Sequence, residues 1–203
     1  MYVPAHFATS DADGLLTRLA GARLSILITP TEEGGLWATH LPMLWNAETR
    51  TLDGHIARAN PHPKLAPNPR ALVITPGPEA YVSPSLYASK AETHRVVPTW
   101  NYEAVHVSGA LTWFEEPARL KDMLRRLTER HEAPRAEPWS IDDAPEDYVN
   151  ALLRGIVGVA VSAEHIEAKR KLSQNKSAAD IAGVIDGLVD DAPEIAALMR
   201  DES

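Results

Sequence analysis

The apolar positions recur every second residue over much of the first two thirds of the chain, which predicts β-strands. In the longest run, Val105 and Val107 alternate with His106 and Ser108, as in a strand with one buried face. Short turns join the runs, which favours a barrel or sandwich over βαβ units. The predicted strands are Leu24–Thr29, Leu36–Leu44, Thr51–Ile56, Ala71–Thr75, Glu79–Ser83 and Tyr102–Phe114.

The segment Pro76-Gly77-Pro78 separates two of these runs. Adjacent prolines and glycine are typical of turns, so the pattern predicts a hairpin that pairs Ala71–Thr75 with Glu79–Ser83.

Helical spacing of apolar residues marks an early segment and most of the last third of the chain. One short helix is expected at Asp13–Ala20, and longer ones at Pro117–His131 and Pro145–Arg154. A final helix begins after Ser177, whose hydroxyl is placed to cap it. Between these helices, the nearly all-apolar run Gly155–Ser162 predicts a buried strand that closes the sheet.

The charge balance limits the partners of the chain. There are 20 Lys and Arg against 28 Asp and Glu, giving a net charge of −8, which disfavours broad binding to nucleic acid or anionic membranes. The absence of cysteine excludes disulfides and thiolate metal sites. No signal-peptide pattern and no membrane-spanning apolar run is present, so the default expectation is a soluble cytoplasmic protein.

The cationic segment, residues 54–70, differs from the acidic chain around it. It holds Arg58, Lys64 and Arg70, and no Asp or Glu occurs from Gly54 to Pro78. Such a cluster is suited to holding an anion, most simply a phosphate, with Asn60 as a further donor. The alternative is a solvated loop stiffened by proline, and the segment alone does not separate the two.

Other chemical motifs are weaker. His40, His55 and His62 lack the spacing of a metal site, so buried or hydrogen-bonded histidines are the better interpretation. The sequence has no GxSxG, no P-loop and no GxGxxG. Four aromatic residues are candidates for stacking on a flat ligand, although core packing is the commoner role: Tyr81, Tyr87, Trp100 and Tyr102.

The end of the chain holds two further features. The run Lys169–Lys176 offers donors to phosphate or ring oxygens, or else forms a solvated connector. The segment Ala178–Ser203 suggests a helix, a turn and a helix, with seven acids and one base. DNA recognition needs the opposite charge, so this segment is interpreted as a packing or dimer element.

Six segments, taken in order, resemble the PaiB-like family of FMN-binding negative transcriptional regulators. The last is followed by Asp180 and Gly183, and together they cover nearly the whole chain. The segments are MYVPAHF (Met1–Phe7), THLPM (Thr39–Met43), GHIARANP (Gly54–Pro61), AYVSPSLY (Ala80–Tyr87), VPTWNYEAVHVSG (Val97–Gly109) and KLSQNK (Lys171–Lys176).

The resemblance implies a mainly β protein with flanking helices, folded as a split β-barrel like the flavin reductase and pyridoxamine-phosphate oxidase relatives. It implies a barrel domain over residues 1–175, with a helical insertion at about 117–154, and a helical extension at 176–203 packed on the same domain. It also implies a homodimer that binds FMN as cofactor.

The same resemblance suggests where FMN lies. The phosphate is expected near Arg58, Asn60 and Lys64, and the ring along Thr39–Leu41. Further contacts would come from the partner or the tail. The complete set of expected cofactor-binding residues is Thr39, His40, Leu41, Arg58, Ala59, Asn60, Lys64, Trp100, Asn101, Lys171, Ser173 and Gln174.

Three functions are compatible with this fold. The first is a regulator that acts on DNA directly or indirectly, although no DNA-reading element is recognisable. The second is a flavin-dependent oxidoreductase, in which the flavin carries the redox step and His40 or His106 serves as acid or base. The third is a haem-binding or haem-degrading protein with a histidine ligand. The first is preferred, and no catalytic residue is assigned.

Overall fold

The computed structural model describes residues 1–67 and 69–202. Asn68 of the cationic segment and Ser203 of the C-terminal segment lie outside the described residues. The chain divides into two compact units. Unit 1 comprises residues 1–11, 76–105 and 167–203, and unit 2 comprises residues 12–75 and 106–166. The expected domain boundary at residue 175 stays a prediction, since these units divide the chain at other positions.

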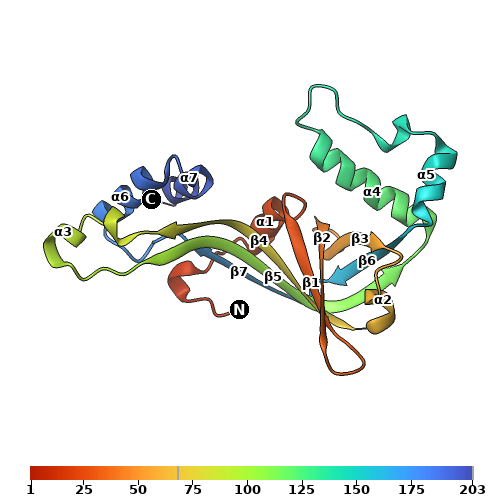
Figure 1. The fold of residues 1–203 in the computed structure, drawn as a ribbon, viewed down its shortest axis with the longest axis horizontal. Helices are drawn as coiled ribbons and strands as arrows, with labels where there is room; N and C mark the ends of the chain where they lie inside the picture. The colour runs from red at the N-terminus through yellow and green to blue at the C-terminus, as the bar shows by residue number, and fades with distance from the viewer. Residues whose placement is uncertain (68, 203) are drawn as a thin grey trace. The chain divides into compact units, whose positions relative to one another are not determined.

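Seven strands are found in the described residues, and they form one sheet (Figure 1). Their order is β4-β1-β2-β3-β6-β5-β7, and β4 also pairs with β5. The strands other than β7 therefore close a ring, so the predicted mainly β barrel is confirmed, with β6 in place between β3 and β5. The strands are β1 (Leu24–Pro30), β2 (Leu36–Asn46), β3 (Thr51–Ala57), β4 (Arg70–Val82), β5 (Thr99–Phe114), β6 (Ile156–Ser162) and β7 (His165–Lys171).

Helices flank the sheet, and the predicted helices are confirmed with small shifts at their ends. The helices are α1 (Ala12–Leu19), α2 (His62–Leu65), α3 (Lys90–Thr93), α4 (Pro117–Glu132), α5 (Glu146–Leu153), α6 (Ala178–Leu188) and α7 (Pro193–Asp201), with 3-10 turns η1 (Ala5–Phe7), η2 (Pro84–Leu86) and η3 (Ile141–Asp143). No described helix is both long and apolar enough to cross a membrane.

Strands β2 and β3 separate partway along their length. Residues 36–42 of β2 pair with β1, whereas only residues 43–46 pair with β3 within the described chain. At the point of separation, a Cβ on Gly54 would lie 2.8 Å from the carbonyl oxygen of Pro42. Residues 39–41 thus have a ladder on the β1 side alone. The other side is called the open edge of β2 below.

The predicted hairpin at Pro76-Gly77-Pro78 is wrong, because β4 runs through these residues as one strand. The fixed φ of proline is compatible with an extended backbone. A Cβ on Gly77 would lie 2.8 Å from Cβ and 3.0 Å from the carbonyl oxygen of Glu103 in β5. Glycine at this position therefore permits the close approach of β4 and β5, rather than a reversal of the chain.

Strand β7 has no counterpart among the predicted elements. Its sequence, HIEAKRK, lacks the alternation of apolar residues that marks the other strands. Its polar side chains are held by partners in unit 1: Lys169 donates to the carbonyl oxygen of Tyr2 at 3.2 Å, and Arg170 pairs with Glu103 at 2.7 Å. These contacts stabilise a strand that hydrophobicity alone does not indicate.

Each unit has a hydrophobic core. In unit 2, helices α4 and α5 pack on β5 and β6 through a cluster of apolar residues: Phe114, Leu120, Met123, Ile141, Val149, Leu153 and Ala160. In unit 1, α6 and α7 pack on β4, on Tyr87 and on the run after β7 in a second apolar cluster: Ala80, Val82, Tyr87, Leu172, Val184, Ile185, Leu188, Ile195, Ala196 and Met199.

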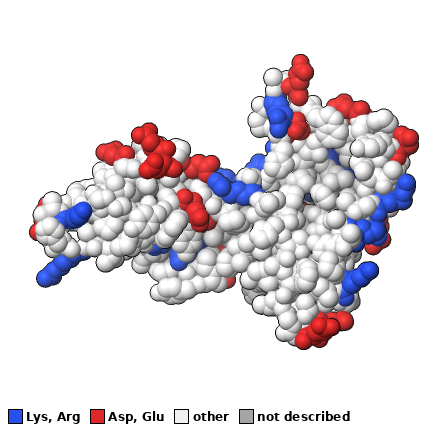
Figure 2. Space-filling view, viewed as in Figure 1, with Lys and Arg blue, Asp and Glu red and all other residues white. Residues whose placement is uncertain are grey.

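The two C-terminal helices thus pack on other elements of unit 1. Ser177 caps α6, because its hydroxyl oxygen accepts the N–H of Asp180 at 3.2 Å. Figure 2 shows acidic side chains gathered over α6 and α7 on the face in view. The suggestion that these helices also form a dimer contact stays a prediction.

Candidate functional site

The cations of the cationic segment differ in what they contact. The Arg58 guanidinium donates to the carbonyl oxygens of Arg154 and Ile156, at 2.6 and 3.1 Å, and pairs with Glu115 at 2.9 Å. Arg70 pairs with Glu164 at 2.6 Å. The Lys64 ammonium has no ion pair or hydrogen bond in the described part of the chain. Lys64 is therefore the cation of this segment most available to an anion.

His62 lies at the centre of a buried network in unit 2. Its Nε2 is 2.8 Å from the Thr29 hydroxyl, and its Nδ1 is 2.9 Å from the Thr39 hydroxyl. The backbone N–H of His62 donates to Asn60 Oδ1 at 3.0 Å. Burial lowers the pKa of the ring, so the neutral form is favoured. His62 therefore fixes the positions of Thr39 and Asn60 and acts as a hydrogen-bonded core histidine.

Asn60 bridges the gap between β2 and the chain that follows β3. Its Nδ2 lies 3.4 Å from the Thr39 hydroxyl, so the middle of the cationic segment is held beside Thr39 of β2. In an antiparallel ladder, alternate residues direct both N–H and C=O away from the paired neighbour. The open edge therefore presents backbone donors and acceptors close to Asn60.

Thr39, His40 and Leu41 cannot all contact a ligand with their side chains from one direction, because successive side chains of a strand point to opposite faces. Leu41 is buried in the core, whereas His40 is exposed. A flat ligand along these residues would therefore use their backbone edge. Arg58, Ala59 and Lys64 are all exposed to solvent.

Five of the expected cofactor-binding residues belong to unit 1: Trp100, Asn101, Lys171, Ser173 and Gln174. Asn101 and Ser173 are buried and bonded to each other, with Asn101 Nδ2 donating to Ser173 Oγ at 3.0 Å and Ser173 Oγ donating to Asn101 Oδ1 at 3.1 Å. Asn101 also donates to the sulfur of Met199 at 3.3 Å. In this chain the Asn101 amide and the Ser173 hydroxyl thus hold the run after β7 against β5.

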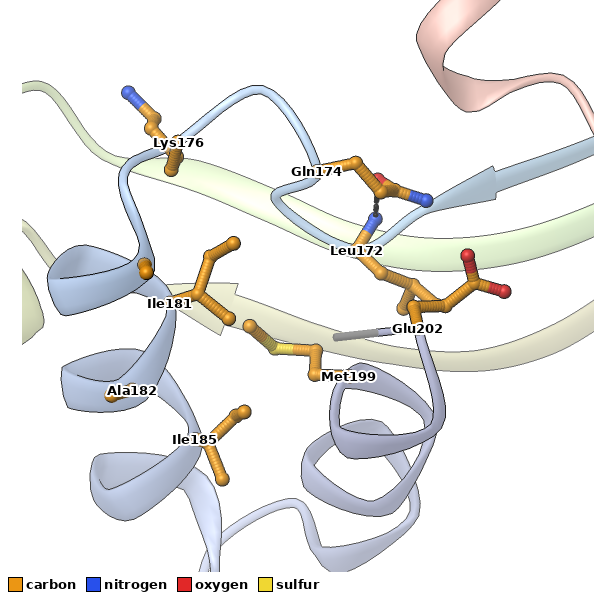
Figure 3. Close-up of a pocket in the computed structure, with 9 residues that line it drawn as sticks. Leu172, Gln174, Lys176, Ile181, Ala182, Ile185, Met199 and Glu202 are labelled. Carbon is orange, nitrogen blue, oxygen red and sulfur yellow. Dashed lines mark hydrogen bonds between the residues drawn. The ribbon is translucent and has the colours of Figure 1, made fainter.

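Gln174 braces the same run. Its Oε1 accepts the N–H of Leu172 at 2.8 Å (Figure 3). Its Nε2 donates to the carbonyl oxygen of Arg170 at 2.7 Å. Between them, Ser173 has a left-handed φ of 66°. The Gln174 amide thus bonds the N–H of Leu172 and the carbonyl oxygen of Arg170 at this tight turn, which gives Gln174 a structural role.

Lys171 and Trp100 lie together on the surface of unit 1. The Lys171 ammonium donates to the Thr99 hydroxyl and, at 2.6 Å, to the carbonyl oxygen of Trp100. Desolvation, followed by repulsion from Lys169 and Lys176, lowers the pKa of Lys171. The Trp100 ring is 51% exposed and meets Tyr81 edge to face at a centroid distance of 6.0 Å. Of the five unit 1 residues, Trp100 alone is classed as exposed.

A cavity of about 380 Å³ adjoins this run in unit 1 (Figure 3). Ile181, Ile185, Met199 and Lys176 are among the residues that line it, and the Lys176 ammonium lies 4.9 Å from the centroid of the Tyr87 ring. No group of three or more His, Cys, Asp or Glu residues suited to a metal was found within the described chain.

Two members of the buried network lie outside the expected cofactor set. Thr29 and His62 hold Thr39 and Asn60 in place through hydrogen bonds. In the sequence, nothing distinguishes Thr29 from the other residues of its strand, or His62 from the other histidine of its proline-rich segment. No local pattern links them, since their contact depends on the pairing of β1 with β2.

Residues 1–165 match the family described as "Putative FMN-binding domain". Over 209 residues the chain is 33% identical to the Bacillus subtilis (strain 168) protein named "Protease synthase and sporulation protein PAI 2", a match that covers 100% of this chain and 98% of the relative.

Two solved structures share the fold. The conserved hypothetical protein Rv2991 from Mycobacterium tuberculosis has a TM-score of 0.60 at 14% identity, covering 86% of this chain and 92% of that chain. The FAD and heme binding protein from Mycobacterium smegmatis has a TM-score of 0.55 at 14% identity, covering 83% and 76%. At these identities the likeness concerns the fold alone.

Proposed function

The chain belongs to the FMN-binding domain family, and on this premise we propose that it binds FMN at the open edge of β2 in unit 2. The observation that carries the proposal is the separation of β2 from β3, which leaves residues 39–41 without a strand partner on that side, while the side chain of Thr39 is hydrogen-bonded to Asn60. The polar rim of a flavin ring needs donors and acceptors of this kind. The cationic segment follows directly in the chain and supplies charge for a phosphate.

The donor set fits a phosphate monoester. Lys64 supplies a full charge without a described competitor, and Asn60 contributes an amide already fixed by His62. Arg58 is able to hold both the protein and a phosphate. Its guanidinium carries five N–H groups, and only three contacts to the protein are described, so N–H donors remain for a phosphate. Because Glu115 already neutralises part of the Arg58 charge, Lys64 is expected to contribute more to phosphate affinity.

FMN, when bound, supplies one- and two-electron redox chemistry. The residues of this chain would bind its phosphate, orient its ring along the strand edge and keep Asn60 in place through the buried threonine–histidine network. No residue is assigned an acid or base role.

Replacing Lys64 with alanine is expected to weaken FMN binding by about tenfold to a hundredfold, because a hydrogen bond to a charged group is worth about 1.5 to 3 kcal/mol. The measurement is a titration of the purified protein with FMN, followed by flavin fluorescence at low and physiological salt. The matched control is Arg70→Gln, which removes a charge from the same segment but one that is already paired with Glu164.

The proposal fails if the wild-type protein does not bind FMN. It also fails if Lys64→Ala binds FMN as tightly as wild type while Arg70→Gln binds it more weakly. A loss confined to Arg58→Ala would move the phosphate from Lys64 to Arg58. Since Arg58 also holds two carbonyl groups of unit 2, its folded state must be checked by thermal unfolding.

We also propose that the protein is a homodimer and that unit 1 of a second copy completes the flavin site. Support comes from Tyr81 and Trp100, which are 50% and 51% exposed and in contact with each other, and from Val97, which is 69% exposed. Exposed apolar clusters of this kind are typical of contact surfaces. Trp100 belongs to the set expected from the resemblance to contact FMN.

The double variant Tyr81→Ser/Trp100→Ser is expected to raise the dimer dissociation constant at least tenfold, because aromatic anchors dominate the energy of interfaces. Analytical ultracentrifugation over a range of concentrations measures this. Tyr148→Ser, which removes a 57% exposed ring from unit 2, is the control and should leave the constant unchanged. A wild-type protein that stays monomeric at all concentrations would contradict the proposal.

The downstream role proposed for the FMN-bound protein is regulation of gene expression in the cytoplasm. Support comes from the PaiB-like resemblance and from the printed name of the Bacillus subtilis relative, which refers to protease synthesis and sporulation. The acidic α6 and α7 disfavour direct DNA contact, so an indirect route is proposed. A sequence-specific gel shift at physiological salt would instead show direct action.

A further inference from the structure

The buried network around His62 determines which part of the Thr39 hydroxyl is free to meet a ligand. Its four residues all belong to unit 2: Thr29, Thr39, Asn60 and His62. Every contact in this network joins a group that donates to a group that accepts. The hydrogen atoms can therefore be assigned one contact at a time.

The orientation of the Asn60 amide is fixed by the backbone. The N–H of His62 can only donate, so the Asn60 atom that lies 3.0 Å from it is the amide oxygen. The amide nitrogen then lies 3.4 Å from the Thr39 hydroxyl. An amide nitrogen can only donate, so the Thr39 oxygen accepts this hydrogen bond.

The Thr29 hydroxyl decides which nitrogen of the His62 ring carries the hydrogen. Thr29 is fully buried, and His62 Nε2, at 2.8 Å, is the sole partner of its hydroxyl within the described residues. If Nε2 carried the hydrogen, the Thr29 oxygen would accept it, and the buried hydrogen of Thr29 would have no acceptor. Such an unpaired buried donor is costly and rare. Thr29 therefore donates to Nε2.

The His62 ring in turn donates to Thr39. Burial lowers the pKa of His62, so the ring is neutral and carries one hydrogen. Because Nε2 accepts, this hydrogen lies on Nδ1, which is 2.9 Å from the Thr39 hydroxyl. The Thr39 oxygen thus accepts from both His62 and Asn60, and its own hydrogen has no acceptor among the described residues. Thr39 is partly exposed, so a ligand can supply that acceptor.

We propose that Thr39 donates a hydrogen bond to an acceptor atom in the ring of the bound flavin, and that Thr29 and His62 are positioning residues that keep the Thr39 hydrogen available for it. The inference rests on the proposed FMN site at the open edge of β2. A flavin ring carries carbonyl oxygens and unprotonated nitrogens, which accept such a bond. A ring that presented an N–H to Thr39 would be rejected, since both lone pairs of the hydroxyl oxygen are occupied.

The first test needs no flavin. Long-range proton–nitrogen NMR spectra of the isotope-labelled protein show which ring nitrogen of His62 carries the hydrogen. Nδ1 is expected to be protonated and Nε2 unprotonated. The opposite tautomer would mean that Thr39 donates to the His62 ring, so no hydrogen would be left for a ligand and the proposal would be overturned.

The second test is a fluorescence titration with FMN and with riboflavin, which has the same ring but no phosphate. Thr39→Val removes the hydroxyl at nearly constant volume and should weaken the binding of both flavins about tenfold, as for one lost hydrogen bond. Thr39→Ser keeps the hydroxyl and should bind both within threefold of wild type. If Thr39→Val does not fold, Thr39→Ala, which leaves space for water beside His62, takes its place with the same expected loss.

Equal losses in Thr39→Ser and Thr39→Val, or a loss for FMN without one for riboflavin, would overturn the proposal. So would wild-type affinity in Thr39→Val together with weakened FMN binding in Lys64→Ala, a result that leaves the proposed FMN site intact. The reverse pattern, a loss in Thr39→Val and none in Lys64→Ala, would support the inference and contradict the position of the phosphate. A wild-type protein that binds neither flavin would overturn both proposals.

Discussion

Replacing Arg170 with methionine is expected to lower the free energy of unfolding by about 3 to 5 kcal/mol, the usual result of removing one partner of a buried ion pair. The Glu103 side chain is fully buried, and its Oε1 accepts the Nε–H of Arg170 at 2.7 Å. Methionine keeps most of the volume of the arginine stem but removes the guanidinium that faces the Glu103 carboxylate. Arg170 also pairs with Glu202 of the C-terminal segment, so the variant loosens that contact as well.

Urea unfolding followed by circular dichroism gives the measurement. The control is Arg135→Met, because the Arg135–Glu132 pair lies on the surface, with the arginine side chain 65% exposed, and should change stability by less than about 1 kcal/mol. The double variant Glu103→Gln/Arg170→Met has no bare charge to bury and should be more stable than Arg170→Met alone. A loss in Arg170→Met no larger than in Arg135→Met would show that Glu103 finds other compensation.

Gly109→Ala is expected to cost about 3 kcal/mol or more, at the upper end of what overpacking a core produces. A Cβ at this position would lie 1.8 Å from the carbonyl oxygen of Ser162 and 2.9 Å from its carbonyl carbon. Both are backbone atoms at the end of β6, so no side-chain rotation relieves the overlap. Strand β5 would have to move away from β6, and the ladder between them would weaken.

Gly35→Ala provides the matched control. Its added Cβ meets only the Thr31 hydroxyl, at 3.3 Å, in an exposed turn between β1 and β2. Thermal unfolding of the two variants should therefore differ by many degrees, with Gly35→Ala close to wild type. Equal melting temperatures would mean that β5 and β6 adjust without cost.

The sequence predicts the barrel well because most of its strands have one buried face, so apolar and polar residues alternate along them. Val105 and Val107 of β5 are an example, since both are buried and the residue between them is not. The hairpin at Pro76-Gly77-Pro78 failed because proline and glycine mark turns by local chemistry, whereas here the reason for Gly77 is the backbone of Glu103, distant in sequence. Strand β7 was missed since its stability comes from ion pairs and hydrogen bonds, which leave no hydrophobic period.

The family was predictable from the sequence, whereas the cationic segment as the place of the phosphate stays a prediction. The full-length match confirms the PaiB-like resemblance that the ordered motifs indicate. What the residues alone did not reveal is which groups are already engaged: Arg58 with two carbonyls and a glutamate, and Asn101 with Ser173. These partners lie 57 to 98 residues apart in the sequence, and their contact depends on strand register, which no local pattern contains.

The division of the chain has a consequence for how the protein is made. Unit 1 is assembled from residues 1–11, 76–105 and 167–203, and its core joins Val82 and Tyr87 to Leu172 and Met199. During synthesis the ribosome releases the first two parts long before the third. All residues of unit 2 have left the ribosome once residue 166 has emerged. The apolar face of β4 in unit 1 stays exposed to solvent until α6 and α7 have been synthesised and pack on it. Nascent chains stalled before residue 167 should therefore be the ones that chaperones hold.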